Sequence, residues 1–139
     1  MTEEVSTFRL YLLRIGYLVT VVLVGINAWP ALINHQGPWD AFVGAGWCLY
    51  AAMSMLAVLG IRYPLKMLPL LFHQMLYKTL WVIAIAIPTW PAMLGGAKAM
   101  AIGIVIDLIV IPWPYVFQHY VKERGDRWKG RSQSVGHEA

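Results

Sequence analysis

Two ionisable residues stand alone inside long apolar stretches, and they are the residues best placed to do chemistry. Lys78 is the only charged residue within residues 67–93, and Asp107 is the only one within residues 99–121. An ionisable side chain at bilayer depth costs free energy unless it has a partner or faces a cavity. Lys78 and Asp107, together with the nearby His73, are also residue types that can transfer protons, so these three are the candidate catalytic residues.

The two charges are expected at similar depth in a membrane. At a rise of about 1.5 Å per residue, Lys78 lies about 20 Å from a helix start at Pro64. Asp107 lies about 15 Å from a start at Ala97, on a helix that runs in the opposite direction. In a hydrocarbon core about 30 Å thick these depths differ by about 5 Å, which a lysine stem can span. We therefore expect a Lys78–Asp107 ion pair.

Further polar side chains fall at a comparable depth. His73, Tyr77 and Trp81 repeat every fourth residue, and Gln74 and Lys78 form the adjacent row, so they share one broad side of a helix. The other expected helices contribute polar residues of their own. The sequence predicts one buried polar layer made of Tyr17, Tyr50, Ser54, His73, Gln74, Tyr77, Lys78, Trp81 and Asp107.

A polar layer inside an apolar bundle predicts a pocket for a lipophilic small molecule such as a quinone, an isoprenoid or a sterol-like compound. His73, Lys78 and Asp107 would orient the polar head of this ligand, with possible acid–base chemistry. The expected ligand-binding residues are Tyr17, Tyr50, Ser54, Gln74, Tyr77 and Trp81.

Three other hypotheses concern the same residues. The layer could be a purely structural network in a non-catalytic accessory subunit. It could be a relay for a proton or small solute in an oligomeric transporter. A haem site is disfavoured, because His35 and His119 are expected at other depths than His73. The sequence names no cofactor and does not decide whether the protein is an enzyme. The single cysteine, Cys48, excludes an internal disulfide and a Cys-rich metal site, and no metal ligands are predicted.

The elements that must position these residues are transmembrane helices. The 139-residue chain is 59% hydrophobic and 13% charged, against about 25% charged in soluble domains. Its apolar stretches predict an all-α, single-domain bundle of four transmembrane helices, with Trp29-Pro30 closing the first helix and Pro112 bending the fourth. The expected helices are residues 7–28, 39–61, 65–87 and 97–120, and residues 121–139 form a polar tail.

The basic residues predict the orientation of the bundle. With four crossings, only Lys98 falls on one side, and a larger group falls on the other side. By the positive-inside rule both termini then face the cytoplasm. This topology, rather than nucleic-acid binding, explains the net charge of +4, and membrane lipids are the expected contacts of the basic tail. The larger group is Arg9, Arg14, Arg62, Lys66, Lys122, Arg124, Arg127, Lys129 and Arg131.

A row of small residues marks one face of the second expected helix. Ala41, Ala45, Cys48 and Ala52 share this face, and small residues let membrane helices approach closely. The row predicts either close packing within the bundle or the seam of a homodimer.

Four strings resemble those of a group of small, uncharacterised bacterial four-helix membrane proteins. They are residues 59–69 (Leu-Gly-Ile-Arg-Tyr-Pro-Leu-Lys-Met-Leu-Pro), 77–81 (Tyr-Lys-Thr-Leu-Trp), 111–117 (Ile-Pro-Trp-Pro-Tyr-Val-Phe) and 125–128 (Gly-Asp-Arg-Trp). In size and helix count the chain is also similar to DoxX-like proteins. The resemblance implies a bacterial cytoplasmic membrane and four helices, and it carries no catalytic motif.

Overall fold

The computed structural model describes residues 5–122, and the regular secondary structure in this part of the chain is helical, without strands. Loops join the helices, and two of the helical segments are short π-helices. In chain order the helical segments are α1 (Thr7–Ile33), α2 (Ala41–Arg62), α3 (Leu68–Trp81), η1 (Val82–Ala86), α4 (Leu94–Val110), α5 (Trp113–Val116) and η2 (Phe117–Lys122).

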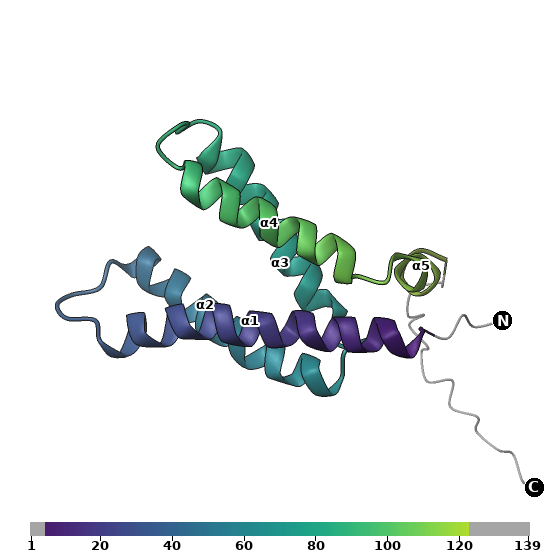
Figure 1. Ribbon diagram of the computed structural model, residues 1–139. Coiled ribbons are helices and arrows are strands. Elements are labelled where there is room, and N and C mark those ends of the chain that lie inside the picture. The colour runs from purple at the N-terminus through teal and green to yellow at the C-terminus, as the bar shows by residue number, and fades with distance from the viewer. Residues whose placement is uncertain (1–4, 123–139) are drawn as a thin grey trace, which may run out of the picture.

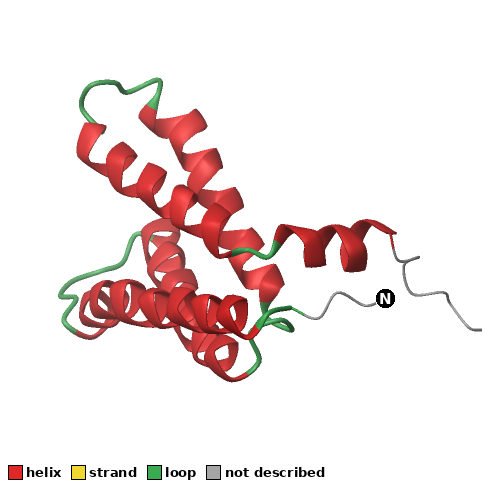
Figure 2. Ribbon diagram, turned by 45° about the vertical axis from the view of Figure 1, so that its right-hand side comes forward, coloured by secondary structure: helices red, strands yellow, loops and turns green. Residues whose placement is uncertain are grey.

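The long helices form two antiparallel hairpins that diverge from a shared end. Figure 1 shows α1 paired with α2 and α3 paired with α4, with the turn between α2 and α3 at the end where the hairpins meet. The loops at residues 34–40 and 87–93 lie at the far ends of the two hairpins, well apart from each other. Figure 2 shows the same divergence from a second direction. The bundle is therefore open toward the loops and closed at the end that carries the α2–α3 turn.

Local signals in the sequence explain where the first two helices begin. The Ser6 hydroxyl accepts a hydrogen bond from the Arg9 N–H at the start of α1. The Asp40 carboxylate accepts from the N–H groups of Phe42 and Val43 at the start of α2, both at 3.0 Å. Such caps satisfy N–H groups that have no partner inside the helix.

The predicted end of the first helix at Ala28 is wrong. α1 continues through Pro30 to Ile33, and the Asn34 N–H still donates to the Pro30 carbonyl at 2.9 Å. A proline removes only one hydrogen bond from the helix, and transmembrane helices tolerate that loss. The predicted bend in the fourth helix is confirmed, since α4 ends at Val110 and the α5–η2 segment turns away from it by 72°.

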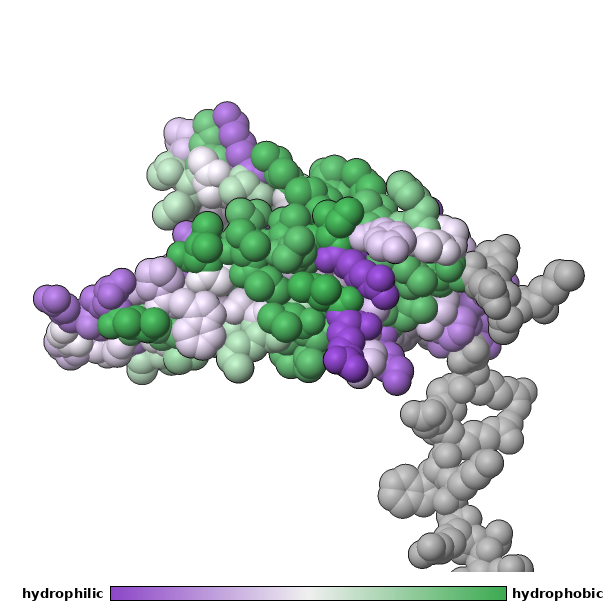
Figure 3. Space-filling model, turned by 60° about the horizontal axis from the view of Figure 1, so that its bottom comes forward, coloured by the Kyte–Doolittle hydropathy of each residue, from purple (hydrophilic) through white to green (hydrophobic). Residues whose placement is uncertain are grey.

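The buried core lies where the two hairpins meet. Leu13 and Tyr17 of α1 pack there with Leu68 and Leu71 of α3 and with Ile111. Away from this end, large apolar side chains cover the outside of every long helix instead of being buried. Figure 3 shows a broad hydrophobic area on one face, between hydrophilic residues toward its two ends.

An apolar outer surface is what a lipid environment favours. Three helices, α1, α2 and the continuous α3–η1 helix (Leu68–Ala86), are long and apolar enough to cross a membrane. A fourth span is added if α4 and the bent α5–η2 segment count as one. The described part of the chain is thus that of an all-helical membrane protein with three candidate spans, or with the four that the sequence predicts if the bent pair counts as one. The greater part of the predicted polar tail, from residue 123 onward, lies outside the described residues.

Candidate functional site

Lys78 and Asp107 form an ion pair between α3 and α4. The Lys78 Nζ lies 2.6 Å from the Asp107 Oδ2, and the two side chains are only 13% and 7% exposed. This geometry confirms the pair expected from the depths of the two residues. Each charge has the partner that a buried ionic group requires.

A glycine on α4 makes room for the lysine stem. A Cβ atom placed at Gly103 would lie 3.0 Å from the Lys78 Nζ and 3.1 Å from its Cε. The stem therefore lies across the bare backbone of α4, one helical turn before Asp107. Gly103 is not among the predicted site residues, although its spacing of four residues from the only acidic residue of this helix is a signal in the sequence.

A second polar contact, between Gln74 of α3 and Thr20 of α1, joins the two hairpins, whereas the ion pair lies within the α3–α4 hairpin. The Gln74 side chain is 3% exposed, and its Nε2 donates to the Thr20 hydroxyl oxygen at 3.2 Å. The Thr20 hydroxyl also lies 3.0 Å from the Gly16 carbonyl, to which it can donate. Thr20 was not among the predicted site residues. A threonine can satisfy its hydroxyl on its own helix, so sequence alone does not mark it as a contact between helices.

A cavity of about 320 Å³ lies between α1 and the α3–α4 hairpin, beside both polar contacts. Its polar lining comes from Thr20, Gln74, Tyr77 and the Lys78–Asp107 pair, and the rest of its wall is aliphatic or glycine. We call this space the pair cavity. Its lining residues are Gly16, Val19, Thr20, Leu23, Val24, Gln74, Tyr77, Lys78, Ala99, Met100, Gly103, Ile106 and Asp107.

His73 does not reach the pair cavity. It lines a smaller cavity of about 200 Å³ between α2 and α3, together with Tyr50. Tyr77 lines both cavities, and its ring makes an edge-on contact with the Tyr50 ring at a centroid distance of 5.8 Å. His73 therefore lines a different cavity from Lys78 and Asp107, and the action of all three residues on one head group stays a prediction.

Three other predicted site residues have structural contacts elsewhere. The Tyr17 hydroxyl donates to the Pro64 carbonyl at 2.9 Å, which fastens α1 to the α2–α3 turn. The Ser54 hydroxyl accepts from the Trp29 Nε1 at 3.2 Å, within the α1–α2 hairpin. Trp81 packs against α4 near its start, where a Cβ at position 96 would lie 2.8 Å from the indole. The residues of the predicted polar layer therefore lie in several separate parts of the molecule and do not form one site.

The row of small residues on α2 faces outward. Ala41, Ala45, Cys48 and Ala52 are all exposed, and α2 instead buries Ala51, Ser54 and Ala57, among other residues. The prediction that this row packs closely within the bundle is therefore wrong, whereas the homodimer seam stays a prediction.

Comparisons with protein-family models, with curated proteins and with solved structures find no match to this chain. The fold and the site alone therefore define the class. It is a small helical membrane protein that holds a buried ion pair beside a cavity. Within residues 5–122, no three His, Cys, Asp or Glu side chains come together in a way that could hold a metal ion.

Proposed function

We propose that this protein binds a lipophilic small molecule in the pair cavity. One observation carries the proposal: the buried Lys78–Asp107 pair borders a cavity whose remaining wall is largely apolar. Small-molecule sites have this composition, an apolar wall with a few polar groups that fix orientation. A purely structural ion pair would be expected to have packed side chains around it rather than a cavity of about 320 Å³.

The ligand would enter from the bilayer. Val19 and Leu23 of α1 and Ile106 of α4 line the cavity, and all three side chains are exposed on the apolar outer surface. An entrance framed by such residues suits a molecule that is already dissolved in the membrane. The quinones, isoprenoids and sterol-like compounds considered from the sequence share this property, and any acid–base step in this cavity would fall to Asp107 and Lys78.

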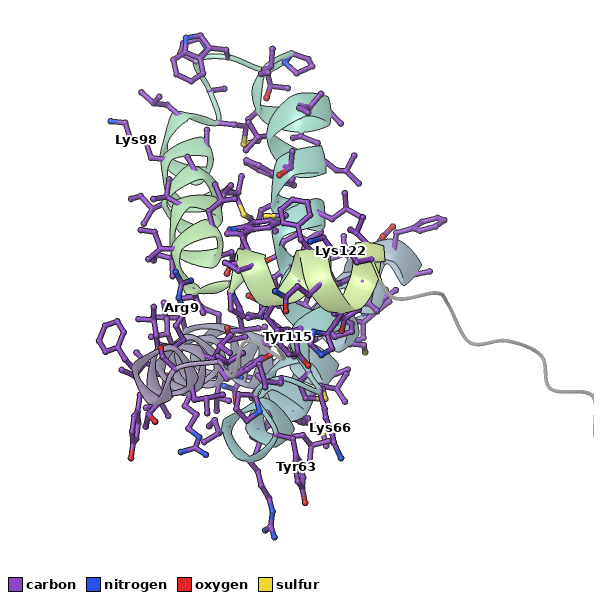
Figure 4. The ribbon with its side chains drawn as sticks, turned by 90° about the vertical axis from the view of Figure 1, so that its right-hand side faces the viewer. Arg9, Tyr63, Lys66, Lys98, Tyr115 and Lys122 are labelled. Atoms are coloured by element: carbon purple, nitrogen blue, oxygen red, sulfur yellow. The ribbon has the colours of Figure 1, made fainter. Side chains whose placement is uncertain are left out.

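The membrane would be a bacterial inner membrane, with both termini on the cytoplasmic side. Figure 4 shows Lys98 near the loop end of α4, whereas Arg9, Lys66 and Lys122 lie toward the other end of the molecule. The positive-inside rule assigns the end with more basic residues to the cytoplasm.

The proposal is tested by filling the cavity. In Met100→Trp the indole would occupy space in the pair cavity, whereas Ile102→Trp places the same indole on the exposed face of α4. Each protein is purified in mild detergent, and the lipophilic compounds that copurify are extracted and identified by mass spectrometry. We expect one compound class to be enriched with the wild type and Ile102→Trp and to be lost with Met100→Trp.

Folding must be checked alongside binding. Circular dichroism and thermal unfolding should give the same helix content for both tryptophan variants. If extracts of the wild type and of a folded Met100→Trp variant contain the same compounds in the same amounts, the cavity binds nothing. The structural or accessory function would then stand.

A further inference from the structure

The chemistry around the ion pair narrows the class of ligand. We infer that the head group bound in the pair cavity is an uncharged hydroxyl, as found in a long-chain alcohol, a sterol or a quinol. This inference rests on the proposed function and specifies its ligand. It follows from the charge balance of the cavity wall and from the hydrogen-bonding groups of Lys78 and Asp107.

The charge balance excludes ionic head groups. Among the described residues, Lys78 and Asp107 are the only acidic or basic side chains that line the cavity, and as an ion pair at 2.6 Å they neutralise each other. A carboxylate, a phosphate or an ammonium in the same space would be a third charge without a partner. Burying an unpaired charge in an apolar environment is strongly unfavourable. The ligand head is therefore neutral.

The hydrogen-bonding groups of the pair favour a head that both donates and accepts. A lysine ammonium has three N–H donors, and a carboxylate has two acceptor oxygens with several lone pairs. The bond between the Lys78 Nζ and the Asp107 Oδ2 uses one donor and one acceptor. A hydroxyl can accept from the Nζ and donate to the carboxylate at the same time. An ether or a ketone can only accept, and would leave the carboxylate without a new donor.

Two of the other polar groups on the wall, Gln74 and Thr20, compete less for the head because they already have hydrogen-bond partners. Gln74 and Thr20 bond to each other, and the Thr20 hydroxyl is also within hydrogen-bond distance of the Gly16 carbonyl. The size of the cavity agrees with a head and the first part of a chain, because about 320 Å³ is at the lower end of small-molecule sites. The rest of an alkyl or isoprenoid tail would extend past Val19 and Leu23 into the bilayer.

A series of ligands with one tail and different heads tests the inference. The full-length protein is reconstituted in phosphatidylcholine nanodiscs with hexadecanol that carries a photoreactive diazirine in its chain. Labelling is then competed with hexadecanol, hexadecyl methyl ether, hexadecanoate and hexadecylamine at matched mole fractions in the bilayer. We expect hexadecanol to displace the probe at about a tenfold lower mole fraction than the ether, which lacks the donated hydrogen bond to a charged acceptor. The carboxylate and the amine should compete more weakly still.

The outcomes separate this inference from the proposed function. Labelling of the wild type and of Ile102→Trp, with loss in Met100→Trp, supports a ligand in the pair cavity. If the ether, the carboxylate or the amine then competes as well as hexadecanol, the hydroxyl inference is overturned and the proposed function stands. If the probe labels Met100→Trp as strongly as the wild type, the alcohol does not occupy the cavity. Loss of the enriched compound in the copurification experiment would then still support the proposed function.

Discussion

Replacing either member of the buried ion pair should destabilise the protein more than the small change in side-chain size suggests. Lys78→Met leaves the Asp107 carboxylate, and Asp107→Asn leaves the Lys78 ammonium, in a site where the side chains are only 13% and 7% exposed. Stranding a buried charge costs about 3–5 kcal/mol, and we expect about 3 kcal/mol for each single variant, because the pair borders a cavity. The double variant strands no charge, so it should cost no more than either single variant.

The prediction is therefore a large coupling energy. The sum of the two single effects should exceed the effect of the double variant by at least about 3 kcal/mol, which is the upper end for residues in contact. The free energy of unfolding is measured in mixed micelles by titration with sodium dodecyl sulfate, with helix content followed by circular dichroism. Helix content before the titration shows whether each variant starts from the folded state.

A matched control separates the loss of a pair from the loss of a lysine. Lys98→Met makes the same change at an exposed position near the start of α4, and should alter the unfolding free energy by less than about 0.5 kcal/mol. If the effects of Lys78→Met and Asp107→Asn instead add to within about 0.5 kcal/mol, the two residues do not interact energetically. The ion pair would then explain neither the stability nor the proposed head-group site.

Three further predictions concern packing, orientation and assembly. Gly60→Ala should lower the unfolding free energy by about 1–3 kcal/mol in the same titration, because the added Cβ overlaps a buried tyrosine ring, whereas Gly46→Ala meets nothing within 4 Å and should be neutral. In intact bacterial cells, a membrane-impermeant maleimide should label Lys98→Cys and spare Lys122→Cys; the reverse pattern would overturn the assigned orientation. If the outward row of small residues is a homodimer seam, mild oxidation of membranes should give a disulfide-linked dimer through Cys48, and a Cys48→Ser variant should stay monomeric on the same gel. A wild type that also stays monomeric would argue against a seam at this face.

The class of fold and the depth of the charges followed from the sequence. Long apolar stretches can only cross a bilayer as helices, because each backbone group must find its hydrogen-bond partner within the chain. The rise per residue of a helix is fixed, so counting from Pro64 and Ala97 was enough to bring Lys78 and Asp107 to one level. Their 2.6 Å contact confirms that reasoning.

Depth, however, is only one coordinate of a residue in a bundle. Tyr17 and Ser54 were expected at the level of the pair, yet Tyr17 bonds to the α2–α3 turn and Ser54 to α1. His73 is on the same helix as Lys78 but lines the cavity on the other side of Tyr77. The direction in which a side chain points depends on how its helix is rotated against its neighbours, and a single apolar helix in lipid carries little information about that rotation.

The sequence by itself thus determined that the chain is helical, that it is suited to a membrane, and that one buried layer holds two opposite charges. Only the tertiary structure decided which side chains share a cavity. The two hairpins diverge instead of converging on one axis, so the predicted layer is divided, and of its members only Gln74, Tyr77, Lys78 and Asp107 border the pair cavity. Gly103 and Thr20 entered the site for the same reason, since a bare backbone and a hydroxyl become significant only when a neighbouring helix is packed against them.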